Sequence, residues 1–389
     1  MHPLRILIGS DTFSPDINGA ARFTERLAAG LVDRGYEVHA AVPAHPEQGV
    51  GEHREVIEGR QMTVHRWKSF RWPFHGKWRI VGPWNANRLA KRTLDRVRPD
   101  VIHVQSHYVV GRGLIKEARR RGIRVIGTNH SMPENLLDHT GLPGPLNKLL
   151  VKWAWNDLHK LYGAVARVTT PTASAAEFLE ENARLHDILA ISCGIDASRY
   201  RPDFTPRREH RVVFVGRQDA EKHIEVLIRA LPLIAPDLDV KLDLVGDGEH
   251  RKHLHDVAVK LGVADRVVQH GAVTDERIIE LLSQASVFAI ASTAELQSIA
   301  TLEALSSALP VVAADAMALP HLVHDGENGW LFPPGDVEAA AERIERVLRL
   351  SPEDRERTQR AALATVKIHS LGHTLDVFEA LYHDQPLPA

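Results

Sequence analysis

The sequence predicts an α/β protein with two Rossmann-like domains, whose parallel sheets face a central cleft. Three observations lead to this prediction. The chain has 389 residues, enough for two or three domains at about 100–200 residues each. Short apolar runs alternate with longer segments of helical periodicity, which is typical of parallel strands joined by crossover helices. This alternation starts again at Arg211, after a stretch that has little periodicity.

The first half contains apolar runs that indicate buried strands, separated by helical segments that end at glycines. One helical segment carries Phe23, Leu27 and Leu31 at helical spacing and stops at Gly35. Another stops at Gly122. Glycine often ends a helix because it adopts the left-handed conformation at little cost. The expected strands are Leu4–Ile8, Val38–Val42, Val101–Val104 and Arg124–Thr128, and the expected helices are Ala21–Arg34 and Leu114–Arg121.

The second half repeats this pattern. The stretch from Ile195 to His210 is rich in Pro, Arg and Asp, and we expect a linker there. Because open parallel sheets bind ligands beyond the carboxyl ends of their strands, we expect the site in the cleft between the domains. The expected strands are Val212–Val215, Lys241–Val245, Val267–Gln269, Val287–Ile290 and Pro310–Ala313, and the expected helices are Ile224–Leu231, Ser298–Ala308 and Leu371–Leu381.

Composition excludes several classes of protein. Hydrophobic residues make up 44% and charged residues 25%, which excludes a disordered chain, a collagen and a disulfide miniprotein. A formal net charge of −2 argues against a protein that coats nucleic acid with its whole surface. Cys193 is the only cysteine, and from the apolar runs we expect neither a secretory signal nor a membrane-spanning helix. We expect a cytoplasmic protein that can associate peripherally with the inner face of the cell membrane.

Two cations follow the first strand of the second half. Gly216 ends this strand, and Arg217 and Lys222 lie at the strand exit and at the start of the next helix. Cations at these positions can clamp a diphosphate. The alternative is a solvated loop with two ordinary surface cations. The next strand ends in a tight turn at Gly246, where a ligand can approach the backbone.

A third segment brackets a predicted helix start with carboxylates. Glu295 follows a strand and Glu303 lies in the second turn of the next helix. Free backbone amides at a helix start favour a phosphate. The alternative is a capping role for Glu295 and a surface position for Glu303. The residues at the helix start are Gln297, Ser298, Ile299 and Ala300.

These pieces together resemble the retaining glycosyltransferases of family 4, which have the GT-B fold. The similarity rests on the R-x4-K pair, the Gly-Asp-Gly turn at 246–248, the E-x7-E segment, the Asp-Gly-Glu-Asn-Gly run at 325–329 and the Leu-Phe-Pro-Pro-Gly-Asp run at 331–336. It covers about 370 residues, and it is specific as a set although each piece alone is common. Such a chain divides into residues 1–193, which bind the acceptor, residues 194–369, which bind the nucleotide sugar, and residues 370–389, a helix that crosses back to the first domain.

The resemblance implies a role for each residue of the second half. Arg217 and Lys222 would neutralise the donor diphosphate as it leaves, and Glu295 would contact the donor sugar. Glu303 would bind the ribose hydroxyls. Gly216, Gly246, Gln297 and the amides of Ser298, Ile299 and Ala300 would complete the donor site. Fixed cations and dipoles would replace a metal, so we expect neither a metal nor a cofactor. Asp237-Leu238-Asp239 matches the Asp-x-Asp pattern of a metal site, but we interpret it as an acidic turn.

The family has a glycine-rich loop after the first strand, and here this loop contains Asn18 and Gly19. Many members have two adjacent glycines. Asn18 therefore replaces one of them, and asparagine also tolerates a positive φ. We expect Gly19 to approach the donor phosphates.

A histidine follows the strand that ends at Thr128. His130 resembles the family's active-site histidine, and a neutral imidazole can polarise a hydroxyl or hold it in place. His103 and His107 have a spacing that a metal could use, but a structural role in a strand and loop is the favoured interpretation.

Basic and aromatic residues alternate in residues 66–79, which contain no acid. Such a segment is typical of a surface that meets anionic lipid. The alternatives are a half-buried strand pair and a surface for single-stranded nucleic acid. Asn147–Tyr162 has a similar composition, with an ordinary core helix as its alternative. We assign the acceptor- or membrane-facing role to Arg66, Trp67, Arg71, Trp72, Lys77 and Trp78.

The sequence therefore predicts a retaining hexosyltransferase that moves a glucosyl or mannosyl group from a UDP- or GDP-sugar to a hydroxyl. The sequences around Gln297 and His130 resemble those of family members that glycosylate diacylglycerol-type lipids. We therefore expect a membrane glycolipid acceptor and no nucleic acid partner. The alternatives are a transferase with a soluble acceptor, a GT-B sugar-nucleotide epimerase and a non-catalytic nucleotide-binding scaffold.

Overall fold

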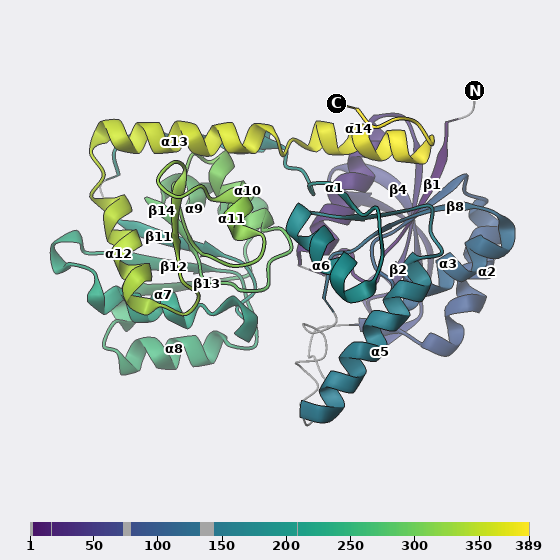
Figure 1. Cartoon of the computed structure of the whole chain (residues 1–389), viewed down its shortest axis with the longest axis horizontal. Coiled ribbons are helices and arrows are strands. Elements are labelled where there is room, and N and C mark those ends of the chain that lie inside the picture. The colour runs from purple at the N-terminus through teal and green to yellow at the C-terminus, as the bar shows by residue number, and fades with distance from the viewer. Residues whose placement is uncertain (1–2, 17, 73–78, 133–143, 208, 389) are drawn as a thin grey trace. The chain divides into compact units, whose positions relative to one another are not determined.

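The structure is a computed structural model and describes residues 3–16, 18–72, 79–132, 144–207 and 209–388. The chain forms two compact units, shown in Figure 1. The first unit comprises Met1–Cys193 and Gly372–Ala389, and the second comprises Gly194–Leu371. Because the end of the chain belongs to the first unit, the backbone passes between the units twice.

The first unit is built on a sheet that is parallel except at one edge. Its strands are β1 (Arg5–Gly9), β2 (Glu37–Pro43), β3 (Gly51–Ile57), β4 (Arg60–Trp67), β7 (Val101–Val104), β8 (Arg124–Thr128), β9 (Arg167–Thr170) and β10 (Leu189–Ala190). Within the described residues the order is β10-β9-β8-β7-β1-β2-β4-β3. Among the strands that the structure describes in this sheet, only β3 and β4 pair in antiparallel fashion. The predicted strands correspond to β1, β2, β7 and β8.

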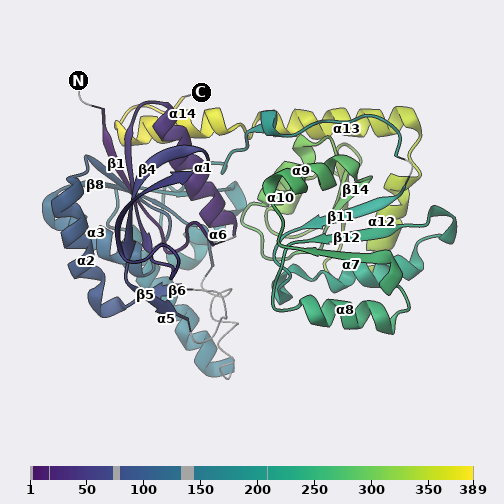
Figure 2. The same cartoon turned by 180° about the vertical axis from the view of Figure 1, so that it is seen from behind.

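Helices cover both faces of this sheet (Figures 1 and 2). They are α1 (Gly19–Asp33), α2 (Ala86–Val97), α3 (Val109–Arg121), α5 (Gly144–Tyr162), α6 (Ala173–Ala183) and α14 (Leu371–Tyr382), and β5 (Ser69–Arg71) pairs with β6 (Arg79–Val81) as a separate hairpin. The predicted ends of α1 and α3 are confirmed. Gly35 lies just beyond α1 with a φ of +88°, and Gly122 ends α3 with a φ of +68°.

The last helix packs against the core of the first unit. The hydroxyl of Tyr382 lies 2.7 Å from His103 Nδ1. The ring of Phe378 contacts the rings of Phe23 and His103. Arg34, the C-cap residue of α1, pairs with Asp376 and Glu379 on α14. These contacts anchor the C-terminal helix to α1 and β7.

The second unit has a sheet in which every neighbouring pair is parallel. Its strands are β11 (Arg211–Val215), β12 (Lys241–Val245), β13 (Val267–Gly271), β14 (Val287–Ile290), β15 (Val311–Ala314) and β16 (Gly329–Phe332). Their order within the described residues is β13-β12-β11-β14-β15-β16. The central strands are apolar at nearly every position because helices bury both faces of the sheet.

Helices pack on this sheet in pairs. They are α7 (Glu225–Ala230), α8 (Arg251–Lys260), α9 (Asp275–Gln284), α10 (Ile299–Ser306), α11 (Leu319–Leu322), α12 (Val337–Leu348) and α13 (Pro352–Lys367). α7 contacts α12, and α10 contacts α13. Side chains at their N-caps fix several helix starts, as Asp336 does for α12 and Ser351 for α13.

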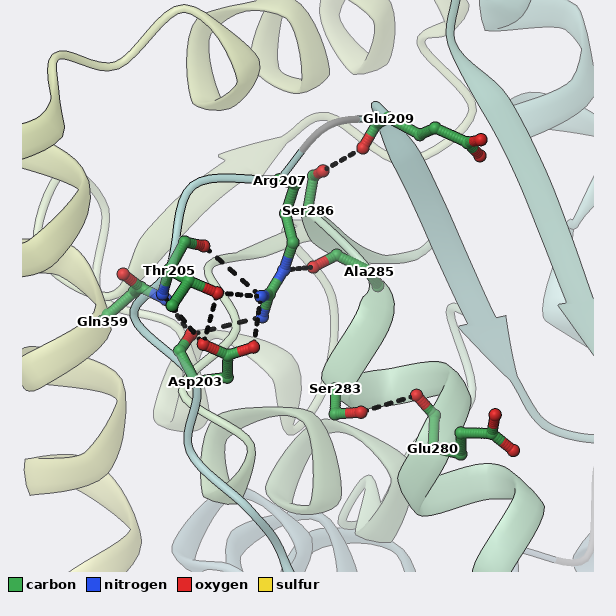
Figure 3. Close-up of polar contacts among 9 residues, drawn as sticks. All are labelled: Asp203, Thr205, Arg207, Glu209, Glu280, Ser283, Ala285, Ser286 and Gln359. Carbon is green, nitrogen blue, oxygen red and sulfur yellow. Dashed lines mark hydrogen bonds and ion pairs between the residues drawn. The ribbon is translucent and has the colours of Figure 1, made fainter.

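The segment that we expected to be a linker is part of the second unit. Arg207 donates hydrogen bonds to Asp203 and to the carbonyl of Ala285 at the end of α9. Gln359 on α13 donates to the carbonyl of Asp203. Figure 3 shows this network, in which Asp203, Thr205 and Arg207 lie close together. The boundary between the units lies between Cys193 and Gly194, so this segment follows the boundary and does not span it.

No helix within the described ranges has the length and apolar character needed to cross a lipid bilayer.

Candidate active site

The loop after β11 carries the two predicted cations, and each is paired with carboxylates. The Nζ atom of Lys222 lies 2.6 Å from Glu295 Oε1, although the two residues are 73 positions apart. Both side chains are largely buried. Glu295 lies in the loop after β14, which is the neighbour of β11 in the sheet. Parallel neighbours deliver their carboxyl ends to one edge, so the two motifs meet there.

Arg217 is held by two acids of its own loop. Its guanidinium contacts Asp219 and lies 2.7 Å from Glu221. Asp219 also accepts a hydrogen bond from the amide of Glu249, in the loop after β12. The sequence analysis missed both Asp219 and Glu221. Only Glu221 has a sequence signal, because it lies four residues after Arg217 and a pair at this spacing can form an ion pair.

The glycines of the second loop serve close packing between backbones. A Cβ atom on Gly246 would collide with the carbonyl oxygen of Gly216, and one on Gly248 with the carbonyl of Gln218. Gly246 also has a φ of +120°. Buried Gln218 donates to the carbonyl of Gly246 at 2.8 Å. In this structure the turn therefore locks the loops after β11 and β12 together.

The helix start predicted at Ser298 is the N-terminus of α10. The Ser298 Oγ atom accepts a hydrogen bond from the amide of Thr301 and caps the helix. Helical geometry leaves the preceding amides, those of Ile299 and Ala300, without an intrahelical partner. Gln297 and Ser298 are buried. The cap leaves two of the predicted amides able to face a phosphate.

Glu303 lies on the same helix and is buried, which excludes the surface position considered as its alternative. It is one turn beyond the capped start of α10. A carboxylate at this depth needs polar partners.

The Asp-Gly-Glu-Asn-Gly run forms a structural turn before β16. Asn328 is fully buried and donates to the carbonyl of Leu322 and to Thr365. Its oxygen accepts from the amide of His324. Asp325 accepts from the amide of Leu331. This run therefore supports β16.

The Asp-Leu-Asp segment is an acidic turn, as interpreted from the sequence. Asp237 pairs with Arg349 on the surface, and Asp239 adopts a left-handed conformation just before β12. It lies before a strand, whereas the loops of Arg217 and Glu295 follow strands. Within the part of the chain that the structure describes, no three His, Cys, Asp or Glu side chains are grouped to hold a metal ion.

His130 follows β8 in the first unit and has defined neighbours. Its Nε2 atom lies 2.8 Å from Gln105 Oε1, and its ring is 4.9 Å from the ring of Phe23 on α1. Burial lowers the pKa of His130 to about 3. The imidazole is therefore neutral at physiological pH, as a group that orients a hydroxyl needs to be.

His103 and His107 have the structural roles favoured from the sequence. His103 bonds to Tyr382 and, through Nε2, to Thr128 at 2.7 Å. The ring of His107 packs against Tyr108 and Tyr162. Burial lowers the pKa of His103 to about 3 and that of His107 to about 4.

The glycine-rich loop differs from the expectation at Asn18. Its φ is −154°, an extended conformation, and its side chain accepts from the amide of Ala21 to cap α1. Asn18 is therefore a helix cap and not a substitute for a left-handed glycine. Gly19 is the first residue of α1.

The same loop contains Asp11, which the sequence analysis did not identify as a functional residue. Asp11 accepts hydrogen bonds from Ser106 and from the amides of Val109 and Val110 at the start of α3. Burial raises the pKa of the Asp11 carboxyl, and these hydrogen bonds oppose the change. It ties the loop after β1 to the loop after β7.

The basic aromatic segment is not one surface. Arg66 is only 2% exposed and donates two hydrogen bonds to Glu55, while Trp67 is 3% exposed and donates to Thr93 in the core. The prediction that these two residues face an acceptor or membrane is wrong, because both side chains are buried. Arg71 is exposed and Trp72 is half-buried. Lys77 and Trp78 lie outside the described residues.

Helix α5 carries an exposed face that combines apolar and basic groups. Leu149 and Trp153 are 64% and 63% exposed, and Leu146 is also exposed. The spacing of these three residues places them on one side of the helix. Lys148 and Lys152 are exposed beside them. The opposite side of the helix packs in the core of the first unit. The alternative of an ordinary core helix therefore applies to that side only. The buried side consists of Trp155, Leu158, Leu161 and Tyr162.

Comparison with known proteins identifies the family. Residues 17–199 match the family described as Glycosyltransferase Family 4, and residues 199–364 match the family described as Glycosyl transferases group 1. A GDP-mannose-dependent alpha-mannosyltransferase of Mycobacterium tuberculosis is 27% identical, over 86% of this chain and 85% of that protein. An alpha-monoglucosyldiacylglycerol synthase of Streptococcus pneumoniae is 24% identical, over 96% of this chain and 85% of that protein.

A solved structure shows the same fold. Sucrose-phosphate synthase from Thermosynechococcus elongatus aligns with a TM-score of 0.82 at 18% identity, over 98% of both chains. The prediction of a GT-B fold is confirmed. With its two family matches in succession and its paired Rossmann-like units, this chain belongs to glycosyltransferase family 4 and is a glycosyltransferase.

Proposed function

We propose that the protein transfers a glucosyl or mannosyl group from a UDP- or GDP-sugar to a hydroxyl of a membrane glycolipid or diacylglycerol-type acceptor, with retention of configuration. The contact between Lys222 and Glu295 carries this proposal. In this contact the cation of Lys222 can bind the donor diphosphate, and the adjacent carboxylate of Glu295 can bind the sugar hydroxyls.

The proposed reaction breaks the bond between the anomeric carbon and the diphosphate oxygen. A new bond forms from that carbon to the acceptor oxygen, and the acceptor proton passes to the leaving diphosphate. Negative charge therefore develops on the diphosphate, and fixed positive groups stabilise it. We assign this stabilisation to Arg217, Lys222 and the amides of Ile299 and Ala300, without a metal ion.

The remaining donor contacts follow from burial and position. Glu295 would hold the sugar near its reacting carbon, and Glu303, which is buried on α10, would accept hydrogen bonds from the ribose hydroxyls. Gln297 would line the same pocket. We place Gly19 near the phosphates and His130, which is neutral, against a hydroxyl of the donor or acceptor.

The exposed face of α5 supports a lipid acceptor. Leu149 and Trp153 can enter the boundary of a bilayer while Lys148 and Lys152 meet anionic headgroups. The half of α5 that carries these residues extends away from the sheet of the first unit (Figures 1 and 2). Arg71 and Trp72 would add to this surface, and the protein would work at the cytoplasmic face of the membrane.

Product analysis tests the proposal. The purified chain is incubated with UDP-glucose or GDP-mannose, with and without liposomes that contain diacylglycerol, and with a chelator in a parallel set. We expect acceptor-dependent nucleotide release, unchanged by the chelator, and an α-linked glycolipid identified by the one-bond C–H coupling at its anomeric carbon. A β-linked product would overturn retention. Transfer only to small water-soluble acceptors would overturn the lipid assignment, and an altered sugar without acceptor would indicate an epimerase.

A further inference from the structure

Gln105 is the only hydrogen-bonding partner of His130 within the described residues. It follows β7 directly, and its amide N–H donates to the carbonyl of Gly9 at the end of β1. The side chain is only 2% exposed. Backbone pairing and burial therefore fix Gln105 at the carboxyl ends of two central strands.

The contact between the two side chains defines the tautomer of His130. A side-chain amide oxygen only accepts hydrogen bonds, so the imidazole Nε2 atom at 2.8 Å carries the proton. A neutral imidazole then has a lone pair on Nδ1. Phe23 packs on the ring and restricts its rotation.

The other end of the Gln105 amide has no hydrogen-bonding partner. Its Nε2 atom is buried and makes no hydrogen bond within the part of the chain described. A buried donor without a partner is destabilising, and native proteins rarely retain one without a reason. The free N–H group of Gln105 is the complement of a ligand oxygen, and the lone pair on His130 Nδ1, on the other side of the ring, is a separate acceptor.

We propose that Gln105 is a positioning residue that holds His130 in the Nε2–H tautomer and that its free amide N–H binds an oxygen of the acceptor. This inference rests on the proposed glycosyl transfer to a hydroxyl and adds a residue to that site. Gln105 acts on the chemistry through His130, and it acts on acceptor binding directly.

Two variants separate the two roles. Gln105→Leu removes both the acceptor oxygen and the donor N–H at similar volume. Gln105→Glu keeps an oxygen for His130 Nε2–H but has no N–H, and its negative charge stabilises the imidazolium. Gln359→Leu is the matched control, because Gln359 is also buried and donates to a carbonyl in the second unit.

The first readout is the tautomer itself, from nitrogen NMR of histidine-labelled full chain at pH 7, with the His130 signal assigned by its loss in His130→Asn. We expect protonated Nε2 and bare Nδ1 in the wild type and in Gln359→Leu, and a mixture in Gln105→Leu. A wild-type ring protonated at Nδ1 would overturn the inference. This spectrum needs no substrate, so it is independent of whether lipid transfer is found.

The second readout is kinetic. Misplacing a group that orients the substrate can cost about 10²-fold in rate, so we expect at least a tenfold lower kcat in Gln105→Leu. Gln105→Glu should recover part of this kcat, keep a raised KM for the acceptor and lose activity toward acid pH. Equal activity of Gln105→Leu and wild type, or equal defects in both variants, would overturn the inference. An inactive wild type with a correct tautomer would instead count against the proposed function.

Discussion

The ammonium group of Lys222 lies 2.6 Å from the carboxylate of Glu295, and this ion pair connects the loops after β11 and β14. The two side chains are largely shielded from water, so the attraction between them is stronger than that of a surface pair. A donor that binds here must reorganise this contact, because its diphosphate competes for Lys222 and its sugar for Glu295.

Replacing Glu295 should separate catalysis from nucleotide binding. We expect Glu295→Ala to lower kcat by about 10²–10³-fold, the usual loss when one fixed group that stabilises the transition state is removed. Affinity for UDP or GDP should stay the same or increase, because Lys222 loses a competing partner. Steady-state kinetics and calorimetry measure the two effects.

The matched control is Glu280→Ala, which removes an exposed carboxylate of the same unit that pairs with Arg277. It should leave both kcat and affinity unchanged. Full activity in Glu295→Ala would contradict the site assignment.

The carboxylate of Glu221 should compete with the donor for Arg217. A partly exposed ion pair is worth about 0.2–1 kcal/mol, so Glu221→Gln should lower the donor KM by up to about fivefold. Asp219→Asn should not lower the donor KM, because Asp219 also accepts a hydrogen bond from the amide of Glu249 and supports the loop. Initial rates at varied donor concentration test this, and a raised donor KM in Glu221→Gln would show that Glu221 assists binding.

Glu25 on α1 should make stability depend on pH. Burial raises the pKa of Glu25 to about 7 from an ordinary value near 4.5. The folded protein therefore holds the proton more tightly than the unfolded chain, so this stabilising contribution is complete below about pH 4.5 and is lost as the pH rises through 7. Glu25→Gln should gain free energy of unfolding relative to the wild type at pH 8 but not at pH 4.

Urea denaturation at both values measures this difference. Glu180, on α6, is also half-buried, and Glu180→Gln serves as the matched control in both measurements. A constant difference between Glu25→Gln and wild type would show that Glu25 titrates normally.

The exposed face of α5 should mediate binding to anionic membranes. Each large apolar side chain that becomes buried contributes about 1.5–3 kcal/mol, so changing Leu149 and Trp153 together to Ser should weaken liposome binding by at least tenfold. Leu233→Ser, an exposed leucine in the second unit, is the control. Co-sedimentation with vesicles containing phosphatidylglycerol checks this, and unchanged binding would exclude α5 as the contact.

Strands and helix ends were predictable because their signals are local. The apolar runs at β11 and β12 and the glycines that end α1 and α3 each report on a few neighbouring residues. Arg66 and Trp67 were not predictable in this way. Their partners Glu55 and Thr93 are distant in the sequence, and only the pairing of β3 with β4 and the packing of α2 bring them near.

The same distinction, between local sequence signals and contacts of distant residues, applies to the candidate site. The family motif indicated Arg217 and Lys222 from spacing alone, but their carboxylate partners depend on side-chain geometry. Gln105 had no sequence signal, since its importance comes from the meeting of β7 and β8. Asn18 was misjudged because asparagine serves equally well as a helix cap and in a left-handed turn.

The most direct test of the central claim is the difference in affinity between nucleoside diphosphates and monophosphates. If Arg217 and Lys222 clamp a diphosphate, the wild type should bind UDP or GDP at least tenfold more tightly than UMP or GMP. The double variant Arg217→Ala/Lys222→Ala should bind both forms of a nucleotide about equally. A double variant that keeps the wild-type preference for the diphosphate would contradict the clamp and the donor site built on it.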